Sequence, residues 1–463
     1  MVTTATSPTE KHEWNRRLST RAERFAAGKA LRQQVPRSSH GEWAPDPERS
    51  DPLSILEESN RTRLEHLVPI RYGRMALSPF AFLRGSAAVM ASDLAKTPVT
   101  GIQAQICGDA HLSNFGIYAS PERRQVFDVN DFDETLAGPW EWDVKRLAAS
   151  VVVAARHNGY SARAIRQAVL KCMASYRTSM QRFATMHHLD VWYFHIPVES
   201  KLTLECDKQR KFIEKLSARA HKRTRIETFP KLAHVVNGEY RIKEDPPLIV
   251  HFPDVLESEA WTASLFDYLA SLSEERRMMI SRYNEVDIAG KVVGVGSVGT
   301  RCMIALFLGG AEGDDPLFLQ IKEASASVLE PYMGASTYPN HGQRVVHGQR
   351  LMQAVSDILL GWSTHDGRDF YVRQLRDMKG SAEVERMNPN IFTLYVELCA
   401  ATLARAHART SDPAQISGYL GNKDQFDHAI ASFAESYADQ TERDHAALIA
   451  AIQEGRIQAQ SEV

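Results

Sequence analysis

The sequence is poor in cysteine and has no long hydrophobic run. Its 463 residues include five cysteines, and these do not occur in pairs with the spacing of a zinc or redox motif. Such scattered cysteines imply no disulfide framework and suit the reduced thiols of a cytoplasmic protein. No apolar run approaches the length that spans a bilayer, and the polar residues 1–17 lack the apolar core of a signal peptide. We therefore expect a soluble cytoplasmic protein without a membrane partner.

The sequence also has no excess of either charge. It contains 55 Lys and Arg and 57 Asp and Glu, for a formal net charge of -2. Because a chain without an overall positive field does not attract a polyanion, no nucleic-acid partner is expected. The composition, 43% hydrophobic and 24% charged, is that of a globular protein. A chain of this length exceeds what one hydrophobic core holds, which predicts two or three subdomains.

Chemically active side chains are concentrated in residues 107–116, which read Cys-Gly-Asp-Ala-His-Leu-Ser-Asn-Phe-Gly. Asp109 and Asn114 have the D-x-x-x-x-N spacing of a kinase catalytic loop, in which the Asp accepts the proton of the substrate hydroxyl and the Asn binds magnesium. Asp109 is therefore the predicted base. Short segments rich in Asp and Asn also form ordinary turns, because their side chains bond the nearby backbone.

A second acidic segment follows a predicted strand. Residues 125–129 are rich in strand-forming side chains and lead into Asp131 and Asp133. In kinases an Asp after such a strand binds magnesium beneath the phosphates. The second segment favours a metal and phosphate site over a plain turn. The predicted metal ligands are Asn114, Asp131 and Asp133.

The local pattern G-D-x-H-x-x-N resembles the corresponding loop of aminoglycoside phosphotransferases and choline kinases. The resemblance implies a catalytic role for His111, which stands where those enzymes carry a His. It also implies that Asp143, at the start of a predicted helix after Gly138-Pro139, buttresses the loop. The same position would suit a plain helix cap.

A glycine-rich segment follows much later in the chain. Gly294, Gly296 and Gly299 form a G-x-G-x-x-G pattern that also contains Ser297. A dinucleotide-binding fold requires a helix after this pattern, whereas the phosphate-covering loop of a kinase leads into a strand. Residues 302–308 are strand-like, which favours the kinase type of loop and predicts contacts between this segment and nucleotide phosphates.

The next predicted strand, residues 317–322, ends at Lys322. A kinase carries at this point the Lys that neutralises the α- and β-phosphates, whereas a plain hairpin with a surface Lys would give the same pattern. Kinases pair this Lys with a helix Glu, but the predicted helix that follows contains none. Glu330 and Glu323 are the nearest candidates, and Glu330 is taken as the predicted partner.

Other elements follow from periodicity and breaker residues. Helices are predicted at residues 52–67, 80–95, 161–183, 208–225, 341–357 and 392–408, and strands at 358–363 and 369–375. Arg71, Arg74 and Arg84 either reach phosphate or form structural ion pairs with the carboxylates. His407, in an apolar helix, is more simply a core histidine than a ligand.

The order of these segments is the reverse of the kinase order, because the Asp109 motif precedes the glycine motif. Circular permutation is physically tolerable, since domain termini commonly lie close together at the surface. We predict an α+β, protein-kinase-like two-lobe fold in permuted order. Its parts are a partly ordered N-terminal arm (1–51), a helical catalytic-loop lobe (52–285), a β-rich nucleotide-binding lobe (286–378) and C-terminal helices packing on the catalytic lobe (379–463).

Several of these motifs together resemble a bacterial family known as a domain of unknown function. The resemblance spans roughly residues 71–411 and is carried by residues 78–85, 107–116, 130–135, 138–147, 294–301 and 341–353. The family looks related to kinase-like and aminoglycoside-phosphotransferase-like folds. The resemblance therefore implies a fold more than a substrate.

The motifs predict a phosphotransferase that uses ATP and Mg2+ and acts on an unknown hydroxyl acceptor, either a small molecule or a protein. Nucleotidyl transfer would use the same metal ligands. A catalytically inactive nucleotide-binding regulator would suit the missing helix Glu. A metal hydrolase built on Asp109, His111, Asp131 and Asp133 would leave the glycine motif and Lys322 without a role.

Overall fold

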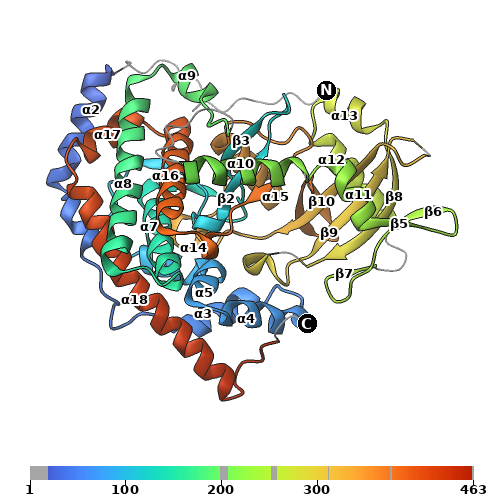
Figure 1. Ribbon diagram of the computed structural model, residues 1–463, viewed down its shortest axis with the longest axis horizontal. Coiled ribbons are helices and arrows are strands. Elements are labelled where there is room, and N and C mark those ends of the chain that lie inside the picture. Colours follow the sequence, from blue (N-terminus) through green and yellow to red (C-terminus); the bar gives the residue numbers. More distant parts are fainter. Residues whose placement is uncertain are drawn as a thin grey trace.

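The computed structural model describes residues 19–198, 207–251, 258–292, 294–310, 312–375 and 378–460. These residues form an α+β protein in which long helices pack beside a six-stranded antiparallel sheet (Figure 1). The described part of the chain has no helical stretch with the length and hydropathy of a membrane span.

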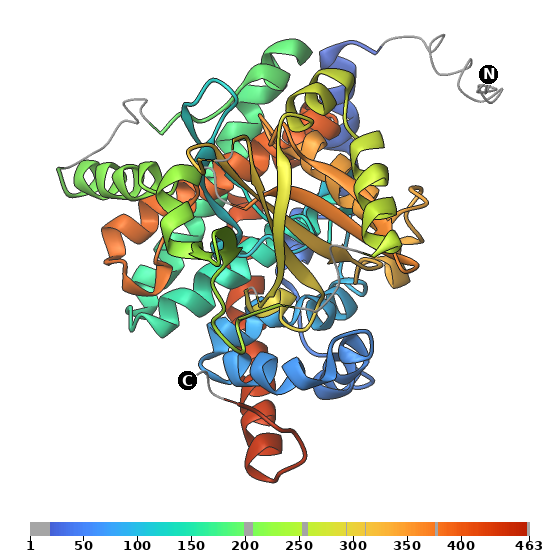
Figure 2. The same ribbon diagram turned by 90° about the vertical axis from the view of Figure 1, so that its right-hand side faces the viewer.

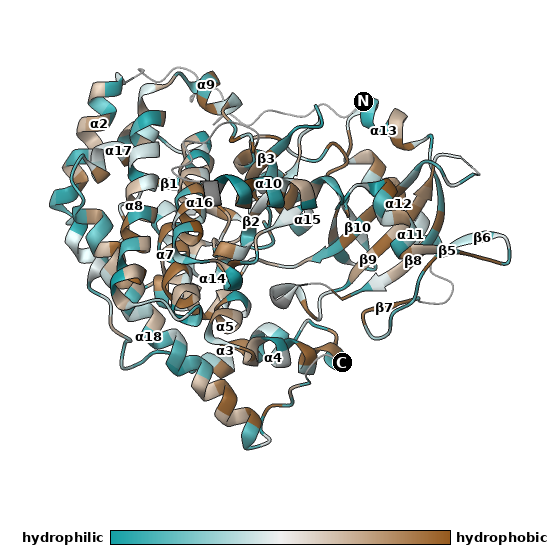
Figure 3. Ribbon diagram, in the orientation of Figure 1, coloured by the Kyte–Doolittle hydropathy of each residue, from teal (hydrophilic) through white to brown (hydrophobic). Residues whose placement is uncertain are grey.

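Helix α7 (Trp140–His157) is central to the helical part, and its residues 140–155 are all buried. α18 (Gln425–Gln453) and α8 (Ala162–Thr185) pack along it, and α16 (Pro389–Thr410) packs on α8. Hydrophobic residues follow these inner helices (Figure 3). The other helices of this part are α2 (Arg21–Ala30), α3 (Pro52–Asn60), α4 (Val68–Ala76), α5 (Pro79–Gly85), α6 (Ala87–Leu94), α9 (His188–Tyr193), α10 (Asp207–His221) and α17 (Pro413–Leu420).

Two small sheets hold the acidic segments. β1 (Gln103–Ile106) pairs with β4 (Leu136–Pro139), and β2 (Phe115–Ala119) pairs with β3 (Gln125–Val129) and with β13 (Gly380–Ser381). The chain leaves β1 for β2 and leaves β3 for β4, so both connections run between the same two sheets.

The larger sheet has the strand order β11-β12-β10-β9-β8-β7. Its strands are β7 (Ile249–Val250), β8 (Asn284–Lys291), β9 (Cys302–Leu308), β10 (Pro316–Ala324), β11 (Gly361–His365) and β12 (Arg368–Gln374). In β10, the register places Lys322 opposite Cys302 of β9 and opposite Tyr371 of β12. In Figure 2 this sheet faces the viewer, and the helices α3 to α5 lie below it.

Several helices cover the larger sheet or lie close to it. α15 (His341–Met352) packs on β10, β11 and β12, and α12 (Glu259–Ala270) packs on β11. Because β7 and α12 precede residue 286, the sheet region takes in more of the chain than the predicted lobe of residues 286–378. The remaining elements are α11 (Arg225–Leu232), the hairpin of β5 (Ala233–Val236) and β6 (Glu239–Ile242), α13 (Glu274–Ile280) and α14 (Glu330–Met333).

Several predicted bounds agree with the structure. The strands predicted at 125–129 and 302–308 are β3 and β9, and a helix begins directly after Gly138-Pro139. The helix predicted from residue 80 begins at Pro79, where the Ser78 hydroxyl caps it by accepting a hydrogen bond from the N–H of Ala81.

The helix predicted over residues 80–95 is broken at Gly85-Ser86 into α5 and α6. Two guanidinium groups satisfy the carbonyls where α5 ends: Arg71 donates to Gly85 O at 2.8 Å and Arg146 to Leu83 O at 2.6 Å. Gly and Ser are weak helix formers, so these side-chain donors suffice to end the helix there.

Two other predicted helices end early. The helix predicted at 52–67 stops at Asn60, and the one predicted at 341–357 stops at Met352. After Met352 the backbone turns, and the Asp357 carboxylate accepts from the N–H groups of Leu359 and Gln374. The predicted strand at 358–363 therefore begins later, as β11 at Gly361.

The described part of the predicted N-terminal arm, residues 19–51, packs on the C-terminal helices. α2 contacts α17, and Arg49 forms ion pairs with Asp93 at 2.7 Å and with Asp444 at 2.6 Å. Residues 1–18 lie outside the described residues.

Candidate functional site

The two acidic segments lie next to each other because their flanking strands are paired. The Asp109 loop (residues 107–114) connects β1 to β2, and the Asp131 loop (residues 130–135) connects β3 to β4. Ile106 pairs with Leu136 and Phe115 with Val129, so each end of one loop faces an end of the other. The backbone N–H of Asn130 also donates to Asn114 O at 2.8 Å.

Helix α7 holds the Asp109 loop with three polar side chains on one of its faces. The Asp143 carboxylate accepts from the N–H of Cys107 at 2.8 Å and of Gly108 at 3.0 Å, and the Ser150 hydroxyl accepts from Leu112 N–H at 3.1 Å. Because α7 begins at Trp140, Asp143 lies inside the helix. The prediction that Asp143 buttresses the loop is therefore confirmed, and a plain helix cap is excluded.

Asp109 itself is fixed by a buried arginine. Both contacts from Arg146 reach Oδ1 of Asp109, at 2.7 Å from Nη2 and 2.9 Å from Nε. Oδ2 lies 3.6 Å from His111 Nε2. Burial raises the pKa of Asp109 although Arg146 opposes the rise. Asn114 donates from Nδ2 to Asp109 O at 2.7 Å, and its amide oxygen is the atom that could accept from a donor or bind a cation.

In the Asp131 loop, Asp133 is surrounded by donors. Its Oδ2 lies 2.7 Å from Lys322 Nζ and 3.1 Å from the Ser297 hydroxyl, and its Oδ1 accepts from the Tyr371 hydroxyl at 2.6 Å. Burial alone would raise the pKa of Asp133, but Lys322 and the hydrogen bond from Tyr371 lower it to about 2. The Tyr371 ring centroid lies 5.3 Å from the same ammonium.

Asp131 has a different environment. Its Oδ1 accepts from the backbone N–H of Asp133 at 3.2 Å, and it forms no ion pair within the described residues. Burial and the neighbouring Asp133 carboxylate raise the pKa of Asp131. Two carboxylates of one loop therefore have pKa values shifted in opposite directions, a pattern common where acid, base and metal-binding roles are divided.

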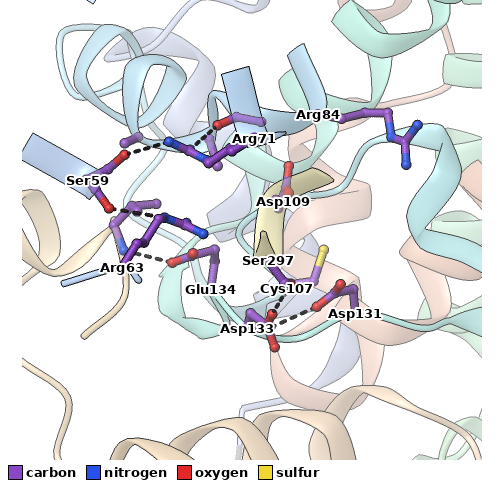
Figure 4. A pocket seen from close by; sticks show the side chains of 15 residues that line it. Ser59, Arg63, Arg71, Arg84, Cys107, Asp109, Asp131, Asp133, Glu134 and Ser297 are labelled. Carbon is purple, nitrogen blue, oxygen red and sulfur yellow. Dashed lines mark hydrogen bonds between the residues drawn. The ribbon is translucent and has the colours of Figure 1, made fainter. Parts of the chain in front are cut away.

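The glycine loop (residues 294–299) closes the same pocket from the side of the sheet. It contains the short 3-10 helix Val295–Ser297 and connects β8 to β9. Figure 4 shows the side chains that line this pocket, which come from the α3–α6 region, the acidic loops, the glycine loop and the segment at Val328. They are Ser59, Arg63, Arg71, Arg84, Gly85, Ala87 and Ala88 of the α3–α6 region, Cys107, Asp109, Asp131, Asp133 and Glu134 of the acidic loops, and Gly296, Ser297 and Val328.

The three glycines of this loop differ in their surroundings. Gly294 and Gly296 are exposed, and a Cβ at Gly296 would have the Arg84 carbonyl as its nearest neighbour, at an ordinary 3.5 Å. Gly299 is buried with a φ of +88°, a conformation that side chains rarely adopt. Gly296 faces the pocket, whereas Gly299 shapes the turn.

The structure brings most of the predicted site residues together. Asp109, Asp131, Asp133, Gly296 and Ser297 line one pocket. Lys322 does not line the pocket itself but forms an ion pair with Asp133, which does. Asn114 donates a hydrogen bond to the backbone carbonyl of Asp109.

Besides Lys322 and Asn114, four predicted residues do not line that pocket. His111 is buried, and its Nδ1 has no partner within the described residues. Glu330 lies near helix α15, 3.7 Å from His341 Nδ1 and 3.9 Å from Arg344 Nε, so it is not placed as the partner of Lys322. Gly294 and Gly299 frame the loop without facing the pocket.

Sequence reasoning missed three contributors to the site. Arg146 was detectable in principle, because Asp143, Arg146 and Ser150 have helical i, i+3, i+7 spacing in an otherwise apolar helix. Tyr371 had no such signal, since only the register of β10 and β12 places it beside Lys322. Arg344 of α15 donates to the carbonyls of residues 133, 135 and 325 and so ties the helix to the Asp131 loop.

The oxygen atoms of the pocket residues suit a hard cation such as magnesium, provided that a bound substrate supplies some of the ligands. Among the described residues, no group of three or more His, Cys, Asp or Glu side chains is arranged to hold a metal ion. Magnesium, however, is usually bound by one or two carboxylates together with substrate phosphates and water. Asp131, a pocket carboxylate without an ion pair in the described residues, fits such a ligand.

Comparison with known proteins gives a family but no activity. Residues 63–451 match the family described as "Uncharacterized protein conserved in bacteria (DUF2252)". No curated protein and no solved structure matches the chain. The match covers most of the sequence and includes both acidic loops, the glycine loop and Lys322. The chain therefore belongs to the DUF2252 family of uncharacterized bacterial proteins.

Proposed function

We propose that this protein is an ATP- and magnesium-dependent phosphotransferase that acts on a hydroxyl acceptor. One observation carries the proposal: the Asp109 loop, the Asp131 loop and the glycine loop meet at one pocket, with Lys322 bound to Asp133 at its side. Phosphoryl transfer depends mainly on positioning and on electrostatic stabilisation, for which such a set of carboxylates, backbone amides and a lysine is suited.

In this reaction Asp109 would act as the general base. As the acceptor oxygen bonds to the γ-phosphorus, the bond from that phosphorus to the β-phosphate oxygen breaks, ADP leaves and the hydroxyl proton moves to Asp109. Arg146 binds Oδ1 and leaves Oδ2 for that proton. The raised pKa of Asp109 makes it a stronger base than an exposed Asp.

The other residues would bind the nucleotide. Lys322 and the exposed backbone at Gly296 would contact phosphate oxygens. Asp131, Asp133 and the amide oxygen of Asn114 are the residues that would hold magnesium. When bound, magnesium neutralises phosphate charge.

The arrangement also supports a protein-kinase-like two-lobe fold in permuted order, which we include in the proposal. The sheet supplies the glycine loop and Lys322, the helical part supplies the carboxylates, and both contribute to one pocket although the Asp109 loop comes first in the chain. Among the described residues, the cysteines Cys107, Cys172, Cys302 and Cys399 are buried free thiols, which is in keeping with a cytoplasmic location.

Calorimetric titration with ATP, with and without magnesium, tests the division of roles. Asp131→Asn should weaken magnesium-dependent ATP binding by about tenfold or more, because a charged ligand is lost. Asp109→Asn should leave binding largely intact and abolish transfer. Asp267→Asn, at an exposed position of α12, serves as the matched control. Equal loss of binding in the two pocket variants would contradict these roles.

Nucleotidyl transfer is the second candidate. Arg63, Arg71 and Arg84 line the pocket from the α3–α6 side and form no ion pair within the described residues. They would suit the terminal phosphates of a nucleotide that lies in the reverse direction, with its α-phosphorus next to the acceptor.

A further inference from the structure

The part of the pocket lining that comes from the α3–α6 region is basic. Arg63, Arg71 and Arg84 contribute to it from the segment between α3 and α6, and we call these three residues the arginine wall. Figure 4 shows Arg63 and Arg71 on the side of Ser59, and Arg84 apart from them, beyond Asp109. The small residues Gly85, Ala87 and Ala88 lie in the same wall. The small residues thus leave room for a ligand beside the positively charged guanidinium groups.

None of the three arginines has a carboxylate partner within the described residues. Arg71 is 2% exposed and bonds only neutral oxygens, those of Ser59, Asn60 and Gly85, while its Nε has no partner. Arg84 also has a buried Nε without a partner, and Arg63 donates to the carbonyls of Ser59 and Val298. Burial, with Arg63 nearby, lowers the pKa of Arg71 well below its usual value. Such a buried charge is costly unless an anion compensates it.

Two of the four pocket carboxylates already pair with other cations, and the other two, Asp131 and Glu134, form no ion pair with any of the three arginines. Asp109 pairs with Arg146, and Asp133 pairs with Lys322. Arg146 and Lys322 are themselves buried. A structural ion-pair role for the arginine wall is therefore not supported by the contacts.

We propose that the arginine wall is a binding subsite for a phosphate-like oxyanion, separate from the position of Lys322. Arginine suits this ligand because its planar guanidinium can donate two parallel hydrogen bonds to phosphate or carboxylate oxygens. The unpartnered Nε atoms of Arg71 and Arg84 provide donors for it.

The arginine wall is joined to the glycine loop. Arg63 donates to Val298 O, and the N–H of Leu64 donates to Gly299 O at 2.8 Å. An anion on this wall would therefore lie beside the nucleotide phosphates. If the proposed phosphotransfer holds, the anion belongs either to the terminal phosphate of the nucleotide or to an acceptor that carries a phosphate or carboxylate in addition to its hydroxyl. Anion binding itself does not depend on that reaction.

Calorimetric titration of the full chain with inorganic phosphate and with tripolyphosphate, at constant ionic strength, tests the subsite. Arg84→Met should weaken binding of one or both anions about tenfold, because a charge-assisted hydrogen bond is lost. Arg84→Lys keeps the charge and should show a smaller loss. Arg61→Met removes an exposed arginine that does not line the pocket and should bind as the wild type does. Thermal melts verify that each variant is folded.

The proposal is overturned if the wild type binds neither anion, or if Arg84→Met binds both as tightly as Arg61→Met does. Comparison of ATP with ADP identifies the source of the anion. A loss of affinity for ATP but not for ADP in Arg84→Met assigns the subsite to the terminal phosphate. Unchanged nucleotide binding, with loss of phosphate binding in the presence of ADP, assigns it to the acceptor.

This result and the proposed function can fail separately. If the protein binds no magnesium-ATP but loses anion binding in Arg84→Met, the subsite stands and the phosphotransferase does not. If Asp131→Asn weakens ATP binding while Arg84→Met changes no anion or nucleotide affinity, the subsite falls and the nucleotide site stands.

Discussion

The Asp109 loop and the glycine loop face the same pocket but are held in different ways. The Asp109 loop is bonded on several sides by buried side chains: Asp143, Arg146 and Ser150 of α7, and Tyr395 of α16, whose hydroxyl donates to Leu112 O. The glycine loop is anchored at one end, where Val298 is buried against Leu67 and Ile70, and it is exposed at Gly296.

This difference separates the two tasks that the proposed reaction requires. A general base must be held in a fixed position relative to the reacting hydroxyl, because small displacements reduce the rate strongly. A phosphate cover must admit and release nucleotide, and loops with few buried contacts open at low free-energy cost. Removal of a side chain that holds the first loop should therefore affect folding, and a substitution at the tip of the second should affect ligand binding.

The largest effect on stability is expected at Asp143. Asp143→Ala leaves the N–H groups of Cys107 and Gly108 without an acceptor and removes the contact with His407, 3.3 Å away. We expect the free energy of unfolding to fall by about 3 kcal/mol or more in urea denaturation. Asp267→Ala, at an exposed helix position, is the control. A loss of less than about 1 kcal/mol would show that the Asp109 loop is not held from α7.

Lys322→Met should have the next largest effect, because it leaves the Asp133 carboxylate without its cation. A loss of about 3 kcal/mol in the free energy of unfolding is expected near neutral pH. Since the pKa of Asp133 is lowered to about 2, the stability that its pairing contributes is present above its ordinary pKa and is lost as the pH falls toward 2. The difference between wild type and variant should therefore shrink below about pH 4. A difference that is constant from pH 7 to pH 3 would contradict the pairing.

Within the glycine loop, Gly299→Ala should be moderately destabilising. The left-handed backbone at Gly299 costs a residue with a Cβ about 1–2 kcal/mol, and the new Cβ would lie 3.0 Å from Arg63 Cβ. Thermal melts without ligand measure this effect. An unchanged melting temperature would show that the turn at Gly299 does not need a left-handed residue.

The smallest effect on unliganded stability is expected for Gly296→Val, within about 0.5 kcal/mol, because the position is exposed and a Cβ fits there. The same change should clearly raise the dissociation constant of magnesium-ATP, since the side chain obstructs the approach of phosphate to the backbone. Melts with and without magnesium-ATP separate the two contributions. A variant that melts much earlier alone but keeps the full ligand-induced shift would mean that Gly296 serves the fold.

The sequence was sufficient to predict features that depend on local pattern. The bounds of β3 and β9 and the start of α7 after Gly138-Pro139 follow from short segments, whereas the role of Asp143 was implied by the resemblance of the Asp109 loop to phosphotransferases. His407 is also the core histidine expected, since it is fully buried and bonded to Tyr176 at 2.8 Å.

Features that depend on contacts between distant segments could not be predicted in the same way. The partner of Lys322 is Asp133, which the helix-based search for a Glu could not find because the pair forms only when the sheet meets the Asp131 loop. The end of α5 at Gly85 depends on donors from Arg71 and Arg146, and the arginine wall forms no ion pair although Asp131 and Glu134 line the same pocket.

The most direct test of the proposed reaction uses ATP labelled in two positions. The protein is incubated with magnesium and with ATP labelled at either the α- or the γ-phosphate, together with a dialysable small-molecule extract as a pool of acceptors. We expect label from the γ-position, and not from the α-position, in a product that forms with the wild type and is reduced about 10²–10⁴-fold in rate with Asp109→Asn, which still binds magnesium-ATP. Transfer of label from the α-position, or an equal rate with Asp109→Asn, would contradict phosphoryl transfer by this pocket.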